Sequence, residues 1–378
     1  MDRRSLLGAF SCATLTSPFA FARSTEPGVT DNEILLGQSA VLSGPLSPGA
    51  ITAQRGAQLL FDEANEQGGV AGRKLRILAL DDALDPAKAV DNYRVLAQQH
   101  QVLACFLGVG AGTTLAGAPV LREAGVPLVG ATAVVDSVRD KTQGVAYYTR
   151  ASQLRECESL VHHLNTLGLR DIAIATLGTP GGQEVAAQLS SVLGKVDLKP
   201  QGVVLVAPDG SNAGDAGRQL AAQKPQAVVL FVTGAPAAGL IQACRQAGCA
   251  PAFYGMSILS GEVTMRMLGA KAAGLAVVQV TPYPWDGASA EAVRYRGAAE
   301  KAGVPVGYHS YEGYLAARVL VEALQRIGRE LTRARLHASL RSLKLRVGSV
   351  DFDFGSGQHT GSRFVELVYV RPDGRFTR

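Results

Sequence analysis

The chain has 378 residues and a net charge of +5, with 47% hydrophobic residues, 18% charged residues and 43 glycines. A single hydrophobic core rarely serves a chain of this length, so we expect two domains of the α/β class. Basic residues alternate with acidic ones along the predicted helices instead of forming runs. This pattern is typical of solvated helix faces and argues against a nucleic-acid partner.

The first residues have the features of an export signal. Arg3 and Arg4 precede an apolar stretch, and Ala20 and Ala22 give the small-x-small pattern of a cleavage site. The apolar stretch is shorter than the ~20 residues needed to span a membrane. We therefore predict that residues 1–22 are removed near Ala22 and that the mature chain is periplasmic. The arginine pair is compatible with both general secretion and twin-arginine export.

Strands and helices alternate along the mature chain. Apolar runs predict strands over 33–42, 73–82, 101–109 and 125–134, and helical periodicity covers 52–69 and 86–99. The same alternation starts again at residue 154. Continuous apolar strands that alternate with helices are typical of a parallel sheet covered on both faces.

Two segments of the chain also resemble each other. Residues 94–130 align with residues 218–255, and the alignment places Gly110 opposite Gly234. One interpretation is that any two strand–loop–helix units look alike. The other is that the chain has two lobes of one architecture, which would place these loops on opposite sides of a shared cleft. Ligands of open α/β sheets usually bind at such carboxyl ends of strands.

The glycine-rich segment FLGVGAGTTL (106–115) does not fit nucleotide-binding patterns. A dinucleotide fingerprint requires glycine where the chain has Thr113, and a P-loop requires a lysine that the segment lacks. A helix N-terminus with unpaired amides and the hydroxyls of Thr113 and Thr114 would suit a small anion such as a carboxylate. The alternative is that Thr113 only caps the helix.

The sequence offers no recognisable catalytic or metal-binding set. A serine-hydrolase elbow at Gly255-x-Ser257 lacks its second glycine, and none of the six histidines stands at metal-ligand spacing from a cysteine. We therefore expect no enzyme activity, no cofactor and no metal. Cys244 and Cys249 could form a short bridge in an oxidising compartment, a question that their spacing leaves open.

Several blocks resemble a known family in order along residues 33 to 376. They include LLGQSAVLSGPL, SYEGYLAARVLVEAL, GSRFVEL and, most specifically, NEQGGVAGRKL with DDALDP in 65–86. The chain resembles the branched-chain amino acid and amide binding proteins of ABC importers, which have the type I periplasmic binding fold. The resemblance implies two Rossmann-like lobes with parallel-core sheets, joined by a three-strand hinge.

The resemblance also implies a ligand site between the lobes. By position, its residues become Ala111, Gly112, Thr113, Ala131, Thr132, Ser152, Gln153, Gly181, Thr233, Gly234 and Ser257. The chain departs from the amino-acid binders where Gly181 and Gly234 replace common aromatic residues. Ser257 replaces the acid that pairs with the ligand amine, and a buried ammonium without a counter-charge is costly. An amide or an aromatic or aliphatic carboxylate is therefore as well supported as an amino acid. Tyr283 and Trp285 either refill the cleft or form a hinge.

The resemblance divides the chain into two discontinuous lobes. We expect a first lobe of residues 23–147 plus 280–347 and a second lobe of residues 148–279 plus 348–378. Lobe closure on the ligand would follow hinge motion. The predicted function is a monomeric solute receptor that delivers its ligand to an ABC permease in the inner membrane. A ligand sensor feeding a regulator or kinase is the main alternative, followed by an exported enzyme or an inert homologue.

Overall fold

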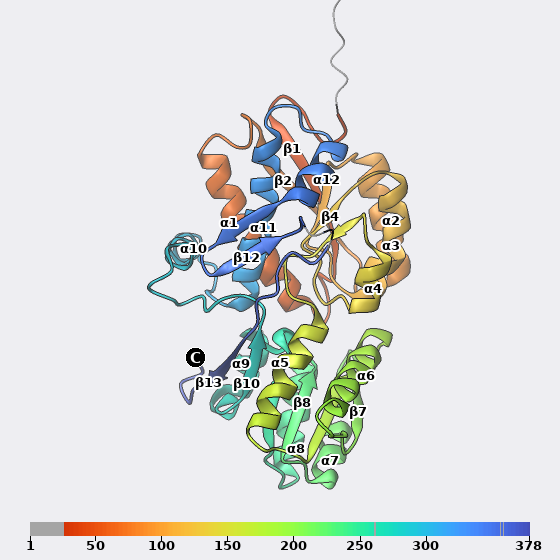
Figure 1. Ribbon diagram of the computed structural model, residues 1–378, viewed down its shortest axis with the longest axis vertical. Helices are drawn as coiled ribbons and strands as arrows, with labels where there is room; N and C mark the ends of the chain where they lie inside the picture. Colours follow the sequence, from red (N-terminus) through yellow and green to blue (C-terminus); the bar gives the residue numbers. More distant parts are fainter. Residues whose placement is uncertain (1–25, 261, 356, 358) are drawn as a thin grey trace, which may run out of the picture.

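The computed structural model describes residues 26–378 except 261, 356 and 358. The predicted export signal therefore lies outside the described residues. Two α/β lobes, each with its own sheet, lie one above the other along the longest axis (Figure 1).

The sheet of the first lobe is entirely parallel. Its strands have the order β2-β1-β3-β4-β5. Their bounds are β1 Glu33–Ala40, β2 Lys74–Asp81, β3 Ala104–Phe106, β4 Leu128–Val129 and β5 Ala146–Tyr147. The apolar runs of the sequence thus predict β1, β2, β3 and β4, although β4 is much shorter than its run, whereas β5 lies outside the predicted strands.

The sheet of the second lobe repeats this order. Its parallel strands run β7-β6-β8-β9-β10, and β13 and β14 extend the sheet antiparallel beyond β10. The bounds are β6 Ile172–Leu177, β7 Val203–Val206, β8 Ala227–Phe231, β9 Ala252–Gly255, β10 Ala276–Gln279, β13 Glu366–Val370 and β14 Phe376–Thr377. The two lobes therefore share one architecture, as the internal likeness of the sequence indicated.

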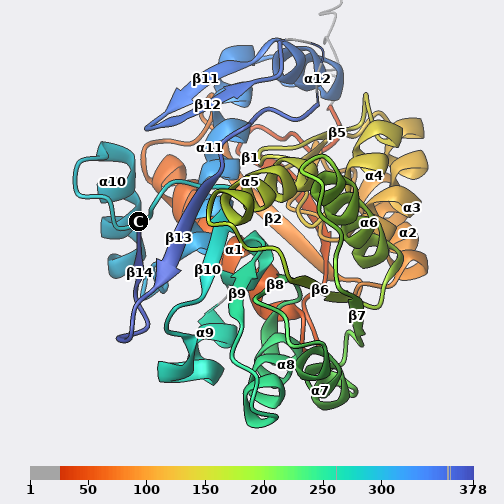
Figure 2. The same cartoon turned by 60° about the horizontal axis from the view of Figure 1, so that its bottom comes forward.

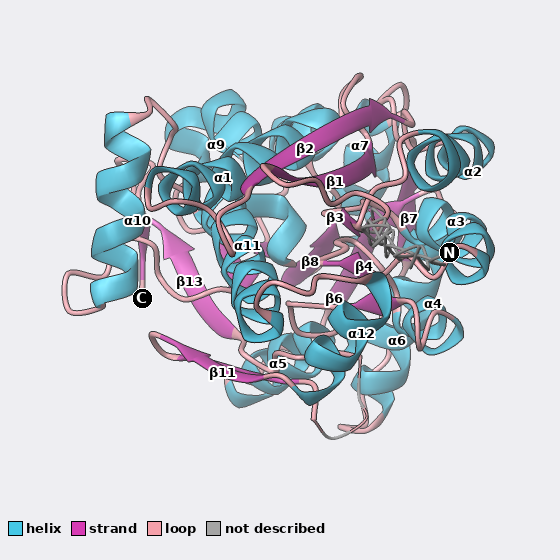
Figure 3. Ribbon diagram, turned by 90° about the horizontal axis from the view of Figure 1, so that it is seen from above, coloured by secondary structure: helices cyan, strands magenta, loops and turns pink. Residues whose placement is uncertain are grey.

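Helices cover both faces of the sheets (Figure 3). In the first lobe, residues of α1 and α11 are buried on one side of the sheet, and residues of α2 and α3 on the other. The helices of this lobe are α1 Ser47–Glu66, α2 Pro86–Arg94 continued by a π-turn Val95–Gln99, α3 Ala111–Glu123, α4 Asp136–Lys141, α10 Ala290–Lys301, α11 Tyr308–Ile327 and α12 Arg333–Ser342. Those of the second lobe are α5 Gln153–Thr166, α6 Pro180–Gly194, α7 Ala213–Gln223, α8 Gly234–Gln246 and α9 Glu262–Leu268, with 3₁₀ turns at Ser257–Ser260 and Gly269–Ala272.

Helices α1 and α11 pack with their backbones in close contact. A Cβ atom on Gly56 of α1 would lie 1.7 Å from the carbonyl oxygen of Ser310, and one on Gly313 of α11 would lie 1.8 Å from that of Ala53. Only residues without a side chain allow this separation. The pairing fixes α11, which carries residues of the interlobe cavity described below.

The first lobe extends further along the chain than its predicted end at residue 347. Strands β11 Lys344–Val347 and β12 Val350–Asp353 form an antiparallel hairpin beside α12 (Figure 2). Val350, Phe352 and Phe354 are buried in the first lobe's core. Three crossovers join the lobes: residues 148–152 between β5 and α5, residues 280–289 between β10 and α10, and the segment between Phe354 and β13. The third crossover runs beside the first, where the Tyr148 N–H donates to the His359 carbonyl at 2.7 Å, before the chain enters the second lobe at β13.

An aromatic cluster lies where the second crossover leaves β10. The ring of Trp285 contacts Tyr308 of α11 edge-on, with centroids 5.8 Å apart, and stacks on Phe376 of β14 at 6.1 Å. Tyr283 packs against the same indole at 5.2 Å. Neither Tyr283 nor Trp285 lines the interlobe cavity. These residues therefore join the lobes at the hinge and do not refill the cleft.

Within the described part of the chain, none of the helices combines the length and the apolar character needed to cross a membrane.

Candidate functional site

A cavity of about 530 Å³ lies between the lobes. Loops at the carboxyl ends of β1, β3, β6 and β8 line it, which is where the strand order reverses in each sheet. Such switch points are the usual ligand sites of open α/β sheets. Most of the wall is apolar, and its larger side chains are Val41, Leu46, Leu84, Pro86, Val109, Leu115, Val135, Val138, Leu177, Phe231 and Ile258.

The structure brings six of the eleven predicted site residues to the cavity wall. They are Ala111, Gly112, Thr113, Thr132, Gly181 and Thr233. The other five are Ala131, Ser152, Gln153, Gly234 and Ser257, and they stand behind or beside the wall. Ser152 caps α5 by accepting the Arg155 N–H at 3.2 Å. Gln153 is buried, and its amide has no hydrogen-bond partner among the described residues.

The start of α3 presents hydrogen-bond donors to the cavity. The N–H groups of Ala111, Gly112 and Thr113 have no protein acceptor among the described residues. The Thr113 hydroxyl instead donates to the Gly110 carbonyl at 3.0 Å and to that of Val109. The Thr113 hydroxyl therefore stabilises the loop before α3, and the backbone amides at the start of α3 are the groups that could bind an anion.

The second lobe closely approaches the first lobe at two glycine positions, of which Gly181 lines the cavity and Gly234 does not. A Cβ atom on Gly181, in the first turn of α6, would lie 3.5 Å from the Cβ of Ala111 in the other lobe. Gly234 has a φ of +64°, and its Cβ would lie 2.9 Å from the Pro45 carbonyl oxygen across the cleft. The two lobes therefore approach each other closely in this structure, and Gly234 suits both the backbone conformation and the contact.

Helices α4 and α6 make direct polar contacts between the lobes. Glu184 of α6 accepts a hydrogen bond from the Ser137 hydroxyl at 2.6 Å and another from the Ser137 N–H at 3.2 Å. Nearby, the Gln188 amide donates to Asp136 at 3.3 Å. Both Ser137 and Glu184 line the cavity. These contacts depend on the closed arrangement of the lobes.

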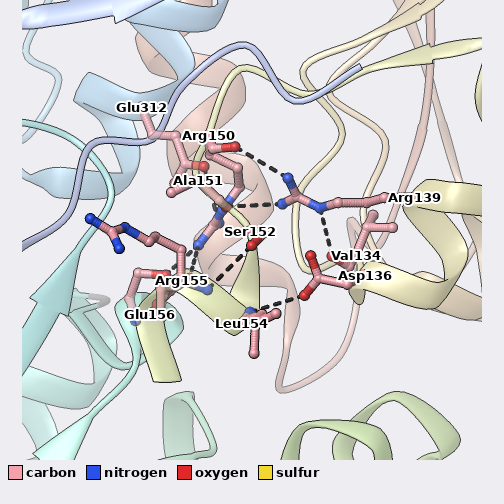
Figure 4. Close-up of polar contacts among 11 residues, drawn as sticks. Val134, Asp136, Arg139, Arg150, Ala151, Ser152, Leu154, Arg155, Glu156 and Glu312 are labelled. Atoms are coloured by element: carbon pink, nitrogen blue, oxygen red, sulfur yellow. Dashed lines mark hydrogen bonds and ion pairs between the residues drawn. The ribbon is translucent and has the colours of Figure 1, made fainter. Parts of the chain in front are cut away.

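A buried cluster of charges adjoins the cavity, and sequence reasoning missed it (Figure 4). Arg150, in the first crossover, donates to Glu312 of α11 at 3.0 Å and to Glu156 of α5 at 3.0 Å. The same guanidinium contacts the Ser257 hydroxyl, and the Ser257 N–H donates to Glu156 at 2.8 Å. Two carboxylates from other elements thus share one guanidinium with Ser257, where the sequence itself has no acid.

Burial and charge act in opposite directions in this cluster. Burial alone would lower the pKa of Arg150, but Glu312 and Glu156 outweigh it, and the pKa lies above its usual value. Burial raises the pKa of Glu156 more than Arg150 and Ser257 lower it. His309 lines the cavity beside the cluster, and its pKa is lowered mainly by burial, against the raising effect of Glu312.

Arg139 fixes the hinge behind this cluster. Its guanidinium donates to the carbonyls of Arg150 at 3.2 Å and Ala151 at 3.0 Å (Figure 4). It also donates to the Thr360 hydroxyl at 3.1 Å. It also lies 4.5 Å from the ring centroid of Tyr148. Burial lowers the pKa of Arg139 to about 10, so it remains charged at neutral pH. One side chain thus ties the first and third crossovers together.

The described residues include no group of three or more His, Cys, Asp or Glu side chains placed to hold a metal ion. Cys244 and Cys249 are unbridged thiols in the structure, and the Cys244 sulfur lies 3.7 Å from the Cys249 carbonyl oxygen. Burial raises the pKa of Cys244 to about 12.

Comparisons with known proteins agree with this architecture. A family model described as periplasmic binding protein matches residues 33–375. A substrate-binding periplasmic protein from Ralstonia solanacearum is similar over 91% of this chain and 99% of its own, with 28% identity and a TM-score of 0.86. A possible leucine/isoleucine/valine-binding protein from Rhodopirellula baltica covers 92% of this chain and 97% of its own, with 25% identity and a TM-score of 0.84.

Curated relatives match shorter stretches. Leu/Ile/Val-binding protein homolog 7 of Brucella abortus is 32% identical over 109 residues, which are 29% of this chain and 27% of that protein. BasB, a substrate-binding protein of a chemotactic signal transduction system in Halobacterium salinarum, is 36% identical over 85 residues, 22% of this chain and 21% of its own. The family match over most of the chain, with the two-lobed fold, decides the assignment. The chain belongs to the periplasmic binding protein family, of the leucine/isoleucine/valine-binding-protein-like type found among ABC transporter substrate-binding proteins.

Proposed function

We propose that the protein is an extracytoplasmic solute receptor that binds a small amino-acid-like, amide or carboxylate ligand between its lobes and delivers it to an ABC importer. The observation that carries the proposal is the cavity of about 530 Å³, lined by the strand-end loops of both lobes. Its size is in the range of small-molecule sites, and its mostly apolar wall with a few polar groups is typical of them. The proposal assigns a binding role and no catalysis.

In this proposal the ligand's anionic group lies at the N-terminus of α3, against the amides of Ala111, Gly112 and Thr113. Helix N-termini favour anions, both through unpaired N–H groups and through the helix dipole. Thr132 completes this half of the site, and Gly181 and Thr233 approach from the second lobe. Ala131, Ser152, Gln153, Gly234 and Ser257 support the wall from behind. Ligand binding would therefore bridge both lobes.

Binding and closure are coupled in the proposed mechanism. A ligand can shift the lobes toward the closed arrangement only through contacts that it makes better in that arrangement. The hydrogen bonds of Glu184 with Ser137 add to this preference, because they join α6 to α4 across the cleft. The three crossovers bend as the lobes separate. We place the third crossover after Phe354, since the β11–β12 hairpin packs with the first lobe.

The remaining parts of the proposal concern the cell. We infer export with cleavage near Ala22, action as a monomer in the periplasm, and docking of the closed form on an inner-membrane permease. Native mass spectrometry of protein purified from its own cell, before and after unfolding and dialysis, is the first test. A discrete bound mass that is lost on unfolding supports a solute receptor and identifies the ligand class.

If no mass is retained, thermal-shift assays with amino acids, amides and aromatic acids follow. A ligand at 100 times its Kd stabilises the folded state by about 2.7 kcal/mol. The absence of any bound mass and of any shift across the panel would contradict the receptor function.

Ser137→Ala tests closure: we expect about fivefold weaker binding, because one hydrogen bond contributes about 1 kcal/mol. Ser190→Ala is the control, since that hydroxyl bonds within α6.

A sensor is the second candidate, and the similarity to BasB, a protein of a chemotactic signalling system, favours it. Such a receptor would bind the same ligand and report it to a membrane-bound signalling protein. Uptake of labelled ligand by cells with and without the gene separates the two functions. Loss of uptake supports the importer, whereas unchanged uptake with loss of a behavioural or transcriptional response to the ligand supports the sensor.

A further inference from the structure

Helix α8 ends in a turn that brings two cysteine residues together. The Cys249 N–H donates to the Cys244 carbonyl at 3.2 Å, and the Gly248 N–H donates to the Arg245 carbonyl at 3.0 Å. Gly248 has a φ of +79°. These two hydrogen bonds and the left-handed glycine define a Schellman turn. In such a turn the side chains of the first and sixth residues, here Cys244 and Cys249, commonly make contact.

Helices α3, α5 and α10 end in the same turn, and they show what these two positions hold elsewhere in the chain. Each has the same pair of hydrogen bonds and a glycine of positive φ at the fifth position. The residues at the first and sixth positions are Leu121 with Val126, Leu164 with Leu169, and Ala299 with Val304. Each pair packs within a hydrophobic core. Helix α8 thus has two thiols where these helices have two apolar side chains.

The two cysteines of this turn are within reach of each other and differ in exposure. The Cys244 sulfur lies 3.7 Å from the carbonyl oxygen of Cys249. A disulfide requires Cα atoms roughly 4.4–6.8 Å apart, a separation that a direct main-chain hydrogen bond between two residues allows. Burial raises the pKa of Cys244, and the neighbouring Cys249 raises it further. Cys244 is fully buried, whereas Cys249 is partly exposed, so an oxidant reaches Cys249 first.

We propose that Cys244 and Cys249 form an intramolecular disulfide that links the end of α8 to the connection into β9. The oxidant is a disulfide-bearing molecule of the oxidising compartment, and this part of the inference rests on the proposed export. The Cys249 thiolate attacks one sulfur of the oxidant, whose S–S bond breaks and releases one thiol. The Cys244 sulfur then loses its proton, attacks the Cys249 sulfur and displaces the second thiol. Two cysteine thiols are thus oxidised by two electrons, and one oxidant disulfide is reduced to two thiols.

The test is a count of thiols in the mature chain, residues 23–378, which has four cysteines. The folded, fully reduced protein is incubated with equal amounts of reduced and oxidised glutathione. It is then quenched with acid, denatured, alkylated with N-ethylmaleimide and weighed by mass spectrometry. We expect two alkylated cysteines, Cys105 and Cys157, which are fully buried and lie outside the turn. The other two should be bridged.

Peptide mapping identifies the bridge. Trypsin cuts after Arg245, between the two cysteines, so a bridged chain yields two joined peptides that separate on reduction. Four alkylated cysteines overturn the inference, as does a bridge to Cys105 or Cys157 or a stable glutathione adduct on Cys249. The incubation uses purified protein without a ligand, so its result does not depend on export or on the receptor function.

The bridge should also stabilise the folded chain. It closes a loop of six residues and so restricts the unfolded chain, and oxidation should raise Tm by about 4–9 °C relative to protein kept in a reductant. In Cys249→Ser the Tm should be the same with and without the reductant. Cys157→Ala is the control, and it should keep the difference seen in the wild type. An unchanged Tm on oxidation of the wild type, or a difference that persists in Cys249→Ser, overturns this role. The wild-type comparison decides the question even if a variant does not fold.

Discussion

Replacement of Arg150 by methionine should destabilise the protein strongly. The substitution keeps an unbranched side chain of similar reach but leaves the carboxylates of Glu156 and Glu312 buried without their cation. Removal of one partner from a buried ion pair costs about 3–5 kcal/mol. A change of 1 kcal/mol shifts Tm by about 2–4 °C in domains the size of these lobes, so we expect Tm to fall by about 6–20 °C.

The loss should also depend on pH in a defined direction. Without Arg150, which lowers it, the pKa of Glu156 in the folded state rises further above its value in the unfolded chain. An acid with a raised pKa in the folded state destabilises it at neutral pH, and this penalty disappears as the pH falls through that raised pKa. The difference in stability between the wild type and Arg150→Met should therefore be smaller at pH 5 than at pH 7.

Urea unfolding and calorimetry of the ligand-free chain measure both effects. Arg155→Met is the matched control, because the Arg155 side chain is 49% exposed and its ion pair with Glu158, at 3.8 Å, lies on the surface. Such a change should alter stability by less than about 0.5 kcal/mol. A loss below about 1 kcal/mol for Arg150→Met, or a loss that does not change with pH, would refute the reasoning.

Three further predictions test other parts of the structure. Gly56→Ala should lower the free energy of unfolding, measured in urea, by about 3 kcal/mol or more, because its Cβ would overlap a carbonyl of α11. Gly297→Ala is the control: its Cβ would have no atom within 4 Å, so it should be neutral or stabilising by up to about 1 kcal/mol. Gly234→Ala and Gly248→Ala should each lower the stability by about 1–2 kcal/mol, because both glycines have a left-handed backbone conformation. Only Gly234→Ala should also weaken ligand binding, by about fivefold or more, because only its Cβ would contact the other lobe. Equal binding by both variants would argue against this closed arrangement. Burial lowers the pKa of His359 in the folded state, so protonation of this histidine favours the unfolded chain as the pH falls from about 6.5 through the lowered pKa. His359→Gln should therefore lose less stability than the wild type between pH 7 and pH 5. Identical pH profiles would contradict that role.

Much of the fold could be predicted because each local pattern has one interpretation. The run at 33–42 is largely apolar and becomes β1 Glu33–Ala40, buried within a parallel sheet. The extent of the first lobe was not predictable in the same way. Val350, Phe352 and Phe354 alternate with other residues as in any half-buried strand, and this pattern does not say which core receives them.

The candidate site was predictable only where it follows the chain locally. Thr113 lies in the first turn of the helix that follows β3, and Thr233 lies just after β8. Both stand next to glycine in strand-to-helix connections, so their position at the cavity follows from the alternation of strands and helices. The charged cluster has no such signal, because Arg150 meets Ser257 and Glu312 across 107 and 162 residues. The sequence shows which of these residues are charged, but their contact depends on how the crossovers position α5 and α11.

The aromatic cluster at the second crossover has a practical consequence. Trp285 is the single tryptophan of the chain, and its ring touches Tyr308 at the start of α11 and Phe376 in the last strand of the second lobe. Separation of the lobes must change the environment of that indole. The tryptophan fluorescence of the unlabelled protein therefore reports opening and closure. If closure follows ligand binding, the same signal measures the solute concentration.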